Sequence, residues 1–161
     1  MSDAASVGAL RGSLPGDVIV PGDPRYDESR KVFNAMHDKR PAVIVRCSST
    51  ADVVAAVNFA RQNGLVVAVR SGGHSVAGLS VCDGGILIDL SGLKIIDVDP
   101  KALTARAGGG VLWGEFDAAT QRHALHTPGG RVTTGVGGFT TGGGYGWTAQ
   151  RASGHRVCRR G

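Results

Sequence analysis

Short apolar runs bounded by turn residues recur along the first two thirds of the chain. Runs of this kind, rich in β-branched side chains, are typical of strands. The sequence therefore predicts strands over 41–46, 65–69, 85–90, 95–98 and 103–107. An Asp-Pro pair lies between the last two runs, which predicts that they are joined by a turn.

One segment between the first two strands has the apolar spacing of an amphipathic helix. Val53, Val57 and Ala60 recur at positions i, i+4 and i+7 and define one predicted face. Ser49 or Thr50 can cap this helix, because a side-chain oxygen there accepts from a free backbone N–H of the first turn. The sequence thus predicts a helix that runs to about residue 63.

Two further helices follow from the same pattern. The longer one is predicted over 110–123, where Leu112, Phe116 and Ala119 share a face, and a short one over 27–36. A strand, a helix and a strand, followed by hairpin-like strands and another helix, describe an α+β domain.

Glycine is the outlier of the composition. The chain has 26 glycines among 161 residues, about twice the usual share. They cluster at 72–73, 84–85, 108–110, 129–130, 135–138 and 142–146. From Leu125 onward small residues dominate, so neither a helix nor a regular strand is expected there. Such clusters mark tight turns or close approach of the backbone to a ligand.

The run from Arg70 to Ser80 carries the most specific candidate chemistry, and it directly follows the predicted strand 65–69. Gly72 and Gly73 have no Cβ atoms to keep a ligand away from the backbone N–H groups. An arginine and two serines add a charge and hydroxyl donors, which together favour an anion-binding turn. His74 lies in the middle of this turn. The pattern indicates a phosphate-bearing cofactor held against a histidine.

Charge argues against a nucleic-acid-binding protein. The formal net charge is +5, but Arg151, Arg156, Arg159 and Arg160 lie in a terminal stretch without acids. The body of the chain is therefore close to neutral and has no basic stripe.

Other classes of protein leave no signature in the sequence. The spacing of Cys47, Cys82 and Cys158 is not that of a metal site, so we expect the chain to bind no metal. We expect Cys47 and Cys82 to be buried free thiols. No apolar run has the length of about 18 residues that a membrane span needs. Without a signal-peptide pattern, a cytoplasmic location is the expectation.

The ordered motifs resemble a known family. The Arg70–Ser80 run is similar to the first flavin-binding loop of FAD-linked oxidases of the vanillyl-alcohol oxidase / p-cresol methylhydroxylase (PCMH-type) superfamily. The berberine bridge enzyme-like branch is the nearest. Further motifs of the family follow in order at 112–114, 127–130, 134–138 and 142–147. The resemblance covers about residues 24–147, after a partly disordered lead-in over 1–23.

The resemblance implies a PCMH-type FAD-binding domain with small parallel and antiparallel sheets flanked by helices. It assigns cofactor contacts to Arg70, Ser71, Gly72, Gly73, His74, Ser75, Pro128, Gly129, Gly130, Thr134, Gly135, Gly137, Gly138, Gly142, Gly143, Gly144 and Gly146. In this family the histidine that matches His74 is commonly attached to the 8α-methyl carbon of the flavin. Arg131 stands where many members carry a second, cysteine link, which implies attachment through the histidine alone.

The resemblance ends after Trp147, where a basic stretch over 148–161 replaces the family's pattern. We interpret this tail as disordered and as the result of a frame change or a shortened gene. In complete relatives, the C-terminal half supplies the substrate site, and substrate oxidation delivers hydride to flavin N5. The alternative to an oxidase domain is a catalytically inactive flavin-binding remnant.

Overall fold

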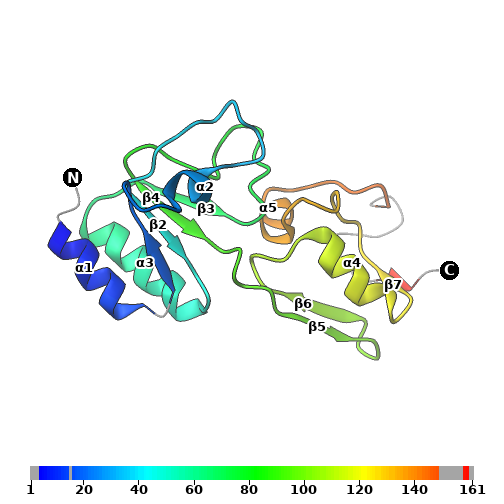
Figure 1. Ribbon diagram of the computed structural model, residues 1–161. Helices are drawn as coiled ribbons and strands as arrows, with labels where there is room; N and C mark the ends of the chain where they lie inside the picture. The colour runs from blue at the N-terminus through cyan, green and yellow to red at the C-terminus, as the bar shows by residue number, and fades with distance from the viewer. Residues whose placement is uncertain (1–3, 15, 149–157, 160–161) are drawn as a thin grey trace.

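Two lobes lie side by side in the computed structural model, which describes residues 4–14, 16–148 and 158–159 (Figure 1). The first lobe contains a four-stranded sheet, and the second contains a two-stranded hairpin with helices. The predicted α+β fold class is confirmed. Within the described residues, no helix is long and apolar enough to cross a membrane.

The larger sheet has the strand order β1-β2-β4-β3. Its strands are β1 (Asp17–Ile19), β2 (Val43–Arg46), β3 (Val67–Arg70) and β4 (Ile86–Asp89). Strand β1 is antiparallel to β2, whereas β2, β4 and β3 run parallel. The loops that leave β2, β3 and β4 therefore start from the same edge of the sheet.

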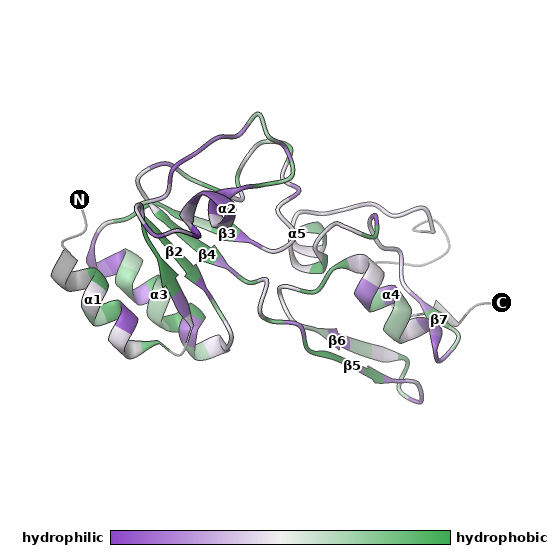
Figure 2. Cartoon of the chain, in the orientation of Figure 1, coloured by the Kyte–Doolittle hydropathy of each residue, from purple (hydrophilic) through white to green (hydrophobic). Residues whose placement is uncertain are grey.

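The central strands β2 and β4 are buried on both faces, which explains their nearly continuous apolar runs, drawn in green in Figure 2. On the edge strand β3, Val67 and Val69 are exposed. Val43, Val45, Ile86 and Ile88 face the helices α1 (Ala4–Ser13) and α3 (Thr50–Gln62). The alternate side chains, Ile44 and Leu87, pack on the other face with Tyr26 of α2 (Tyr26–Arg30).

Helix α3 begins where its capping residue predicts. Ser49 is the N-cap, and its side chain accepts from the backbone N–H of Asp52. The predicted apolar face is only partly right, because Val57 is exposed whereas Ala56 and Phe59 are buried against the sheet. The three apolar positions used for the prediction do not by themselves distinguish between two adjacent faces of the helix. Packing against the sheet decides which face is buried.

The lead-in, expected to be partly disordered, contains a helix among the residues that the structure describes. Helix α1 packs at one edge of the hydrophobic core between the larger sheet and α3. Val7, Leu10 and Leu14 are buried there. Three apolar side chains at helical spacing provide enough surface to dock this helix on its neighbours. The short predicted helix over 27–36 ends early, since α2 stops at Arg30.

The second lobe begins with the predicted hairpin of β5 (Ile96–Asp99) and β6 (Thr104–Ala107). Helix α4 (Trp113–Gln121) packs on it, and Val111, Trp113 and Phe116 form the core of this lobe. Cys47 and Cys82, in the first lobe, are free and buried, as expected.

Two predictions for the end of the chain need correction. Residues 136–141 form a helix, α5 (Val136–Thr141), where no regular structure was expected. Strand β8 (Cys158–Arg159) pairs with β7 (Leu125–His126), so this part of the predicted disordered tail is ordered. The rest of that prediction concerns residues 149–157 and 160–161, which lie outside the described residues.

Candidate functional site

The site lies at the edge of the sheet where the parallel strands end. In-register pairing places Arg46, Arg70 and Asp89 side by side at the ends of β2, β3 and β4. The Asp89 carboxylate, which is 1% exposed, accepts from Arg70 Nη2 at 2.8 Å and from Arg46 Nε at 3.3 Å. Its burial raises the pKa of Asp89, but the hydrogen bond and charge of Arg70, together with hydrogen bonds from Ser91, outweigh this and hold that pKa below its ordinary value.

This pairing gives Arg70 a different position from the one the sequence predicts. A second guanidinium nitrogen, Nη1, donates to the carbonyl oxygen of Lys31 at 2.9 Å. The Arg70 side chain is therefore held beneath the loop by Asp89, and its charge is compensated there. It supports the loop from below and does not line the cavity above it.

A cavity of about 470 Å³ lies between the loop after β3 and the segment around α5. The loop contributes residues from Ser71 to Ser80, and the second segment contributes residues from Thr134 to Gly142. The predicted site residues that line it are Ser71, Gly72, Gly73, His74, Ser75, Thr134, Gly135, Gly138 and Gly142. The tertiary structure thus brings the two glycine-rich motifs to opposite walls of one cavity.

Unpaired donors line this cavity. Among the described residues, the backbone N–H groups of 72–75 donate to no protein acceptor. The hydroxyl oxygens of Ser71 and Ser80 are buried and also have no partner among the described residues. Consecutive free N–H groups form a concavity that suits an anion, and buried hydroxyls without partners suit a polar ligand. This donor set fits the diphosphate of a dinucleotide cofactor.

Ser80 is a candidate that the sequence reasoning left out. Ser80 is the last residue of the Arg70–Ser80 run. The cofactor contacts assigned from the sequence in this loop stop five residues earlier, at Ser75. The chain turns back after Leu79, so the Ser80 side chain returns to the cavity wall. Ser75 already has a partner, since its Oγ accepts from the Leu79 N–H at 3.0 Å.

His74 lies in the cavity wall with its ring stacked on Phe33. The ring centroids are 4.0 Å apart and the planes differ by 23°. The backbone N–H of Phe33 also donates to the carbonyl oxygen of Gly73 at 3.1 Å. Phe33 lies far from the motif in sequence, so only the fold reveals this contact.

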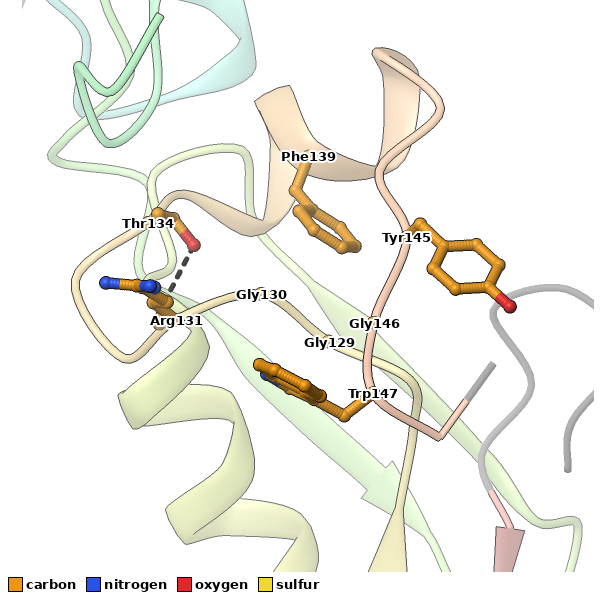
Figure 3. Close-up of a pocket in the computed structure, with 8 residues that line it drawn as sticks. All are labelled: Gly129, Gly130, Arg131, Thr134, Phe139, Tyr145, Gly146 and Trp147. Atoms are coloured by element: carbon orange, nitrogen blue, oxygen red, sulfur yellow. Dashed lines mark hydrogen bonds between the residues drawn. The ribbon is translucent and has the colours of Figure 1, made fainter. Parts of the chain in front are cut away.

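A second cavity, of about 550 Å³, adjoins the first through Thr134 and Phe139, which line both. Figure 3 shows the rings of Phe139, Tyr145 and Trp147 around it. Thr134 Oγ1 donates to the Arg131 carbonyl oxygen at 2.7 Å and holds the turn between them. Three more predicted site residues, Gly129, Gly130 and Gly146, line this second cavity.

The remaining predicted residues lie outside these two cavities. Gly137 lines a smaller cavity of about 270 Å³ next to Trp113 and Thr127. Gly144 packs against the Phe139 ring, and Pro128 is buried. Gly143 has a φ of +73°, which explains why a glycine stands there. Among the described residues, no group of three metal-ligating side chains comes together.

The sequence profile of a family described as FAD binding domain matches residues 41–160. This match covers well over half of the chain. The chain belongs to this FAD-binding family. The match continues past Trp147, where the sequence analysis placed the end of the resemblance.

Known relatives agree with this assignment. The chain is 41% identical over 104 residues to (R)-6-hydroxynicotine oxidase of Paenarthrobacter nicotinovorans, which covers 65% of this chain and 23% of that protein. It is 38% identical over 135 residues to the uncharacterized FAD-linked oxidoreductase YvdP of Bacillus subtilis, which covers 83% of this chain and 30% of that protein.

Solved structures show the same fold. The crystal structure of 6-hydroxy-D-nicotine oxidase from Arthrobacter nicotinovorans superposes with a TM-score of 0.82 at 36% identity, over 85% of this chain and 30% of that one. The BBE-like 1 protein of Physcomitrella patens superposes with a TM-score of 0.85 at 28% identity, over 90% of this chain and 32% of that one. The chain therefore spans less than a third of the length of these relatives, and it is an FAD-binding domain of the kind found in FAD-linked oxidoreductases.

Proposed function

We propose that this chain holds FAD in the cavity between the Ser71–Ser80 loop and α5, with the diphosphate on the backbone N–H groups of 72–75. The observation that carries this proposal is the set of donors without partners at that cavity, four backbone N–H groups and two buried hydroxyls. Each would gain an acceptor from a bound diphosphate or ribose. When bound, FAD accepts hydride at N5 from a substrate carbon and passes the electrons to dioxygen.

The second part of the proposal is a covalent bond between His74 and the 8α-methyl carbon of the flavin. His74 lines the same cavity as the free N–H groups, so a cofactor bound there would lie next to His74. The unprotonated ring nitrogen of His74 would form the bond to carbon, and the proton on the other ring nitrogen would leave, while the methyl carbon would lose one hydrogen as a proton. The electron pair released in this step would be taken up by the flavin, and dioxygen would then accept it with formation of hydrogen peroxide.

The tether is tested by denaturing the purified chain and measuring the flavin absorbance and the mass that stay with the protein. We expect the wild-type chain to keep one FAD and His74→Ala to keep none, although the latter still binds FAD reversibly. His123→Ala is the matched control, because His123 is exposed and lies outside the cavity. Retention of flavin by His74→Ala would refute the tether, and absence of any bound FAD in a folded wild-type chain would refute the proposed site.

Oxidation of a small-molecule substrate is proposed for the longer architecture that the relatives share. Its substrate contacts would come from outside the cavity described above, whose walls supply cofactor contacts. The described residues that could orient the flavin ring are those around the second cavity, namely Arg131, Phe139, Tyr145 and Trp147. Reduction of bound flavin by a substrate, followed as loss of its visible absorbance, tests this activity directly.

A further inference from the structure

The segment over 31–39, between α2 and β2, lies against the outside of the Ser71–Ser80 loop. We call it the bracing segment. Its contacts with the loop are Arg70 Nη1 to Lys31 O at 2.9 Å, Phe33 N to Gly73 O at 3.1 Å, His37 Nε2 to Val76 O at 2.8 Å and Lys39 Nζ to Gly78 O at 3.0 Å. The loop is thus attached along most of its length to a second stretch of chain.

Phe33 is unusual within this segment because the residue is 74% exposed and yet its ring stacks on that of His74. An exposed aromatic ring contributes little to a hydrophobic core. Core packing therefore does not explain why the Phe33 ring lies where it does. Its backbone is fixed at the same point, through the hydrogen bond to Gly73. The ring is therefore held over the imidazole by the main chain beside it.

The His74 ring has no other restraint in the described part of the chain. Its nitrogens make no hydrogen bond to a described residue. The torsion that rotates a histidine ring is broad, so a free imidazole samples many planes. A parallel aromatic neighbour at 4.0 Å limits that rotation and selects one plane.

We propose that Phe33 is a positioning residue that sets the plane of the His74 imidazole for bond formation with the 8α-methyl carbon of FAD. The inference rests on the proposed tether. Bond formation between two bound groups depends steeply on their orientation, and a pre-set ring avoids the loss of rotational freedom during the reaction. Phe33 acts on the rate of attachment, and FAD binding itself depends on other residues.

The experiment uses the full chain, purified without flavin from riboflavin-starved cells and then mixed with a series of FAD concentrations. Covalent attachment is followed with time as flavin fluorescence that survives denaturation. We expect Phe33→Ala to lower the maximal rate by about 2- to 13-fold, as the strength of an aromatic pair implies. The half-saturating FAD concentration is expected to stay the same.

Three further variants separate positioning from folding. Phe33→Tyr keeps a stacking ring and should restore the wild-type rate, whereas Phe33→Leu keeps bulk without the ring and should react as slowly as Phe33→Ala. Met36→Ala removes another exposed apolar side chain of the bracing segment and should react as the wild type does.

Other outcomes would overturn the inference in distinguishable ways. An unchanged maximal rate in Phe33→Ala and Phe33→Leu, with normal attachment in the wild type, refutes the role of Phe33 alone. A change confined to the half-saturating concentration shows that Phe33 serves binding, which also refutes it. Reversible FAD binding without attachment in the wild-type chain refutes the tether itself, and the role of Phe33 with it.

Discussion

Gly72 and Gly135 meet backbone to backbone in the wall of the cavity between the Ser71–Ser80 loop and α5. A Cβ atom built on Gly72 would lie 2.9 Å from the Cα of Gly135, and one built on Gly135 would meet the backbone nitrogen of Gly72. The loop after β3 and the start of α5 are therefore joined where neither has a side chain. This contact sets the separation of the two walls that line the cavity.

Gly72→Ala is expected to push these walls apart. An added methyl group has no space at a backbone contact, and overpacking of this kind costs about 1–3 kcal/mol of unfolding free energy. FAD affinity should fall as well, because the free N–H groups move relative to the opposite wall. Urea unfolding and FAD titration measure the two effects.

The matched control for Gly72 is Gly8→Ala in α1. Nothing lies within 4 Å of a Cβ built there, so the variant should gain about 0.5–1 kcal/mol from the better helix propensity of alanine. Equal stabilities of the two variants would contradict the proposed backbone contact.

Asp89→Asn is expected to destabilise the first lobe strongly. The substitution removes the charge that compensates the buried Arg70 guanidinium, and breaking such a buried pair costs about 3–5 kcal/mol. Asp38→Asn is the control, since its carboxylate pairs with Arg30 but is 69% exposed and should matter little. Similar midpoints of urea unfolding for the two variants would argue against this role of Asp89.

The same carboxylate predicts a loss of stability in acid. The pKa of Asp89 in the folded chain lies below its ordinary value of 3.8: burial raises it, but the hydrogen bond and charge of Arg70 and the hydrogen bonds from Ser91 together lower it by more. A group with a lowered folded pKa contributes its full stability above the unfolded pKa, and this is lost as the pH falls through the folded pKa. Unfolding free energies measured from about pH 6 to pH 3 should therefore decrease more steeply for the wild type than for Asp89→Asn.

Ser71→Ala and Ser80→Ala should affect the free and the FAD-bound protein differently. Each removes a buried hydroxyl without a partner, so the free chain should be as stable as the wild type or slightly more stable. FAD affinity should fall by about 2- to 13-fold, the worth of one hydrogen bond. Thermal unfolding with and without FAD measures both quantities.

Ser75→Ala provides the contrast for the serine pair. Its Oγ already accepts from Leu79 N, so its loss should weaken the loop in the free chain too. If Ser71→Ala or Ser80→Ala destabilises the chain without FAD, the hydroxyl has a hydrogen-bond partner within the protein and is not free to bind a ligand.

The start of α3 allows a prediction about a capping carboxylate. One oxygen of Asp52, Oδ2, accepts from Ser48 N and Ser48 Oγ, both at 2.8 Å, and from Ser49 N at 3.0 Å. Ser49→Ala should cost about 0.5–2 kcal/mol, as other N-cap losses do, and Asp52→Ala should cost more because it leaves three donors without an acceptor. Chemical denaturation of both variants tests this order, and a smaller loss for Asp52→Ala would contradict it.

Local signals in the sequence predicted the elements that local interactions decide. The strands at 43–46 and 86–89 and the Ser49 cap lie within the predicted ranges. The predicted hairpin also forms, although its first strand ends one residue beyond the predicted range, at Asp99. The helix α5 escaped prediction because its Val-Gly-Gly-Phe-Thr-Thr sequence has poor helix propensity. Contacts of Val136 and Phe139 with the second core hold it in place.

For the site, too, local sequence predicted what depends on local residues and missed what depends on contacts between distant segments. The motif around His74 indicated the cofactor class, and the family match and the cavity agree with it. Arg70 was expected to add its charge to the anion site, whereas in the structure this charge is paired with Asp89, which comes from the neighbouring strand. Phe33 and Ser80 were missed, since their relation to His74 depends on how the chain folds back.

The sequence by itself determined the family, the glycine-rich loop and the histidine within it, because these depend on residue types at fixed spacing along one stretch of chain. The tertiary structure decided which donors remain free, which charge is compensated and which ring lies over His74. Those properties depend on strand register and on backbone contacts such as that of Gly72 with Gly135. Contacts between distant segments are set by packing, and no local pattern encodes them.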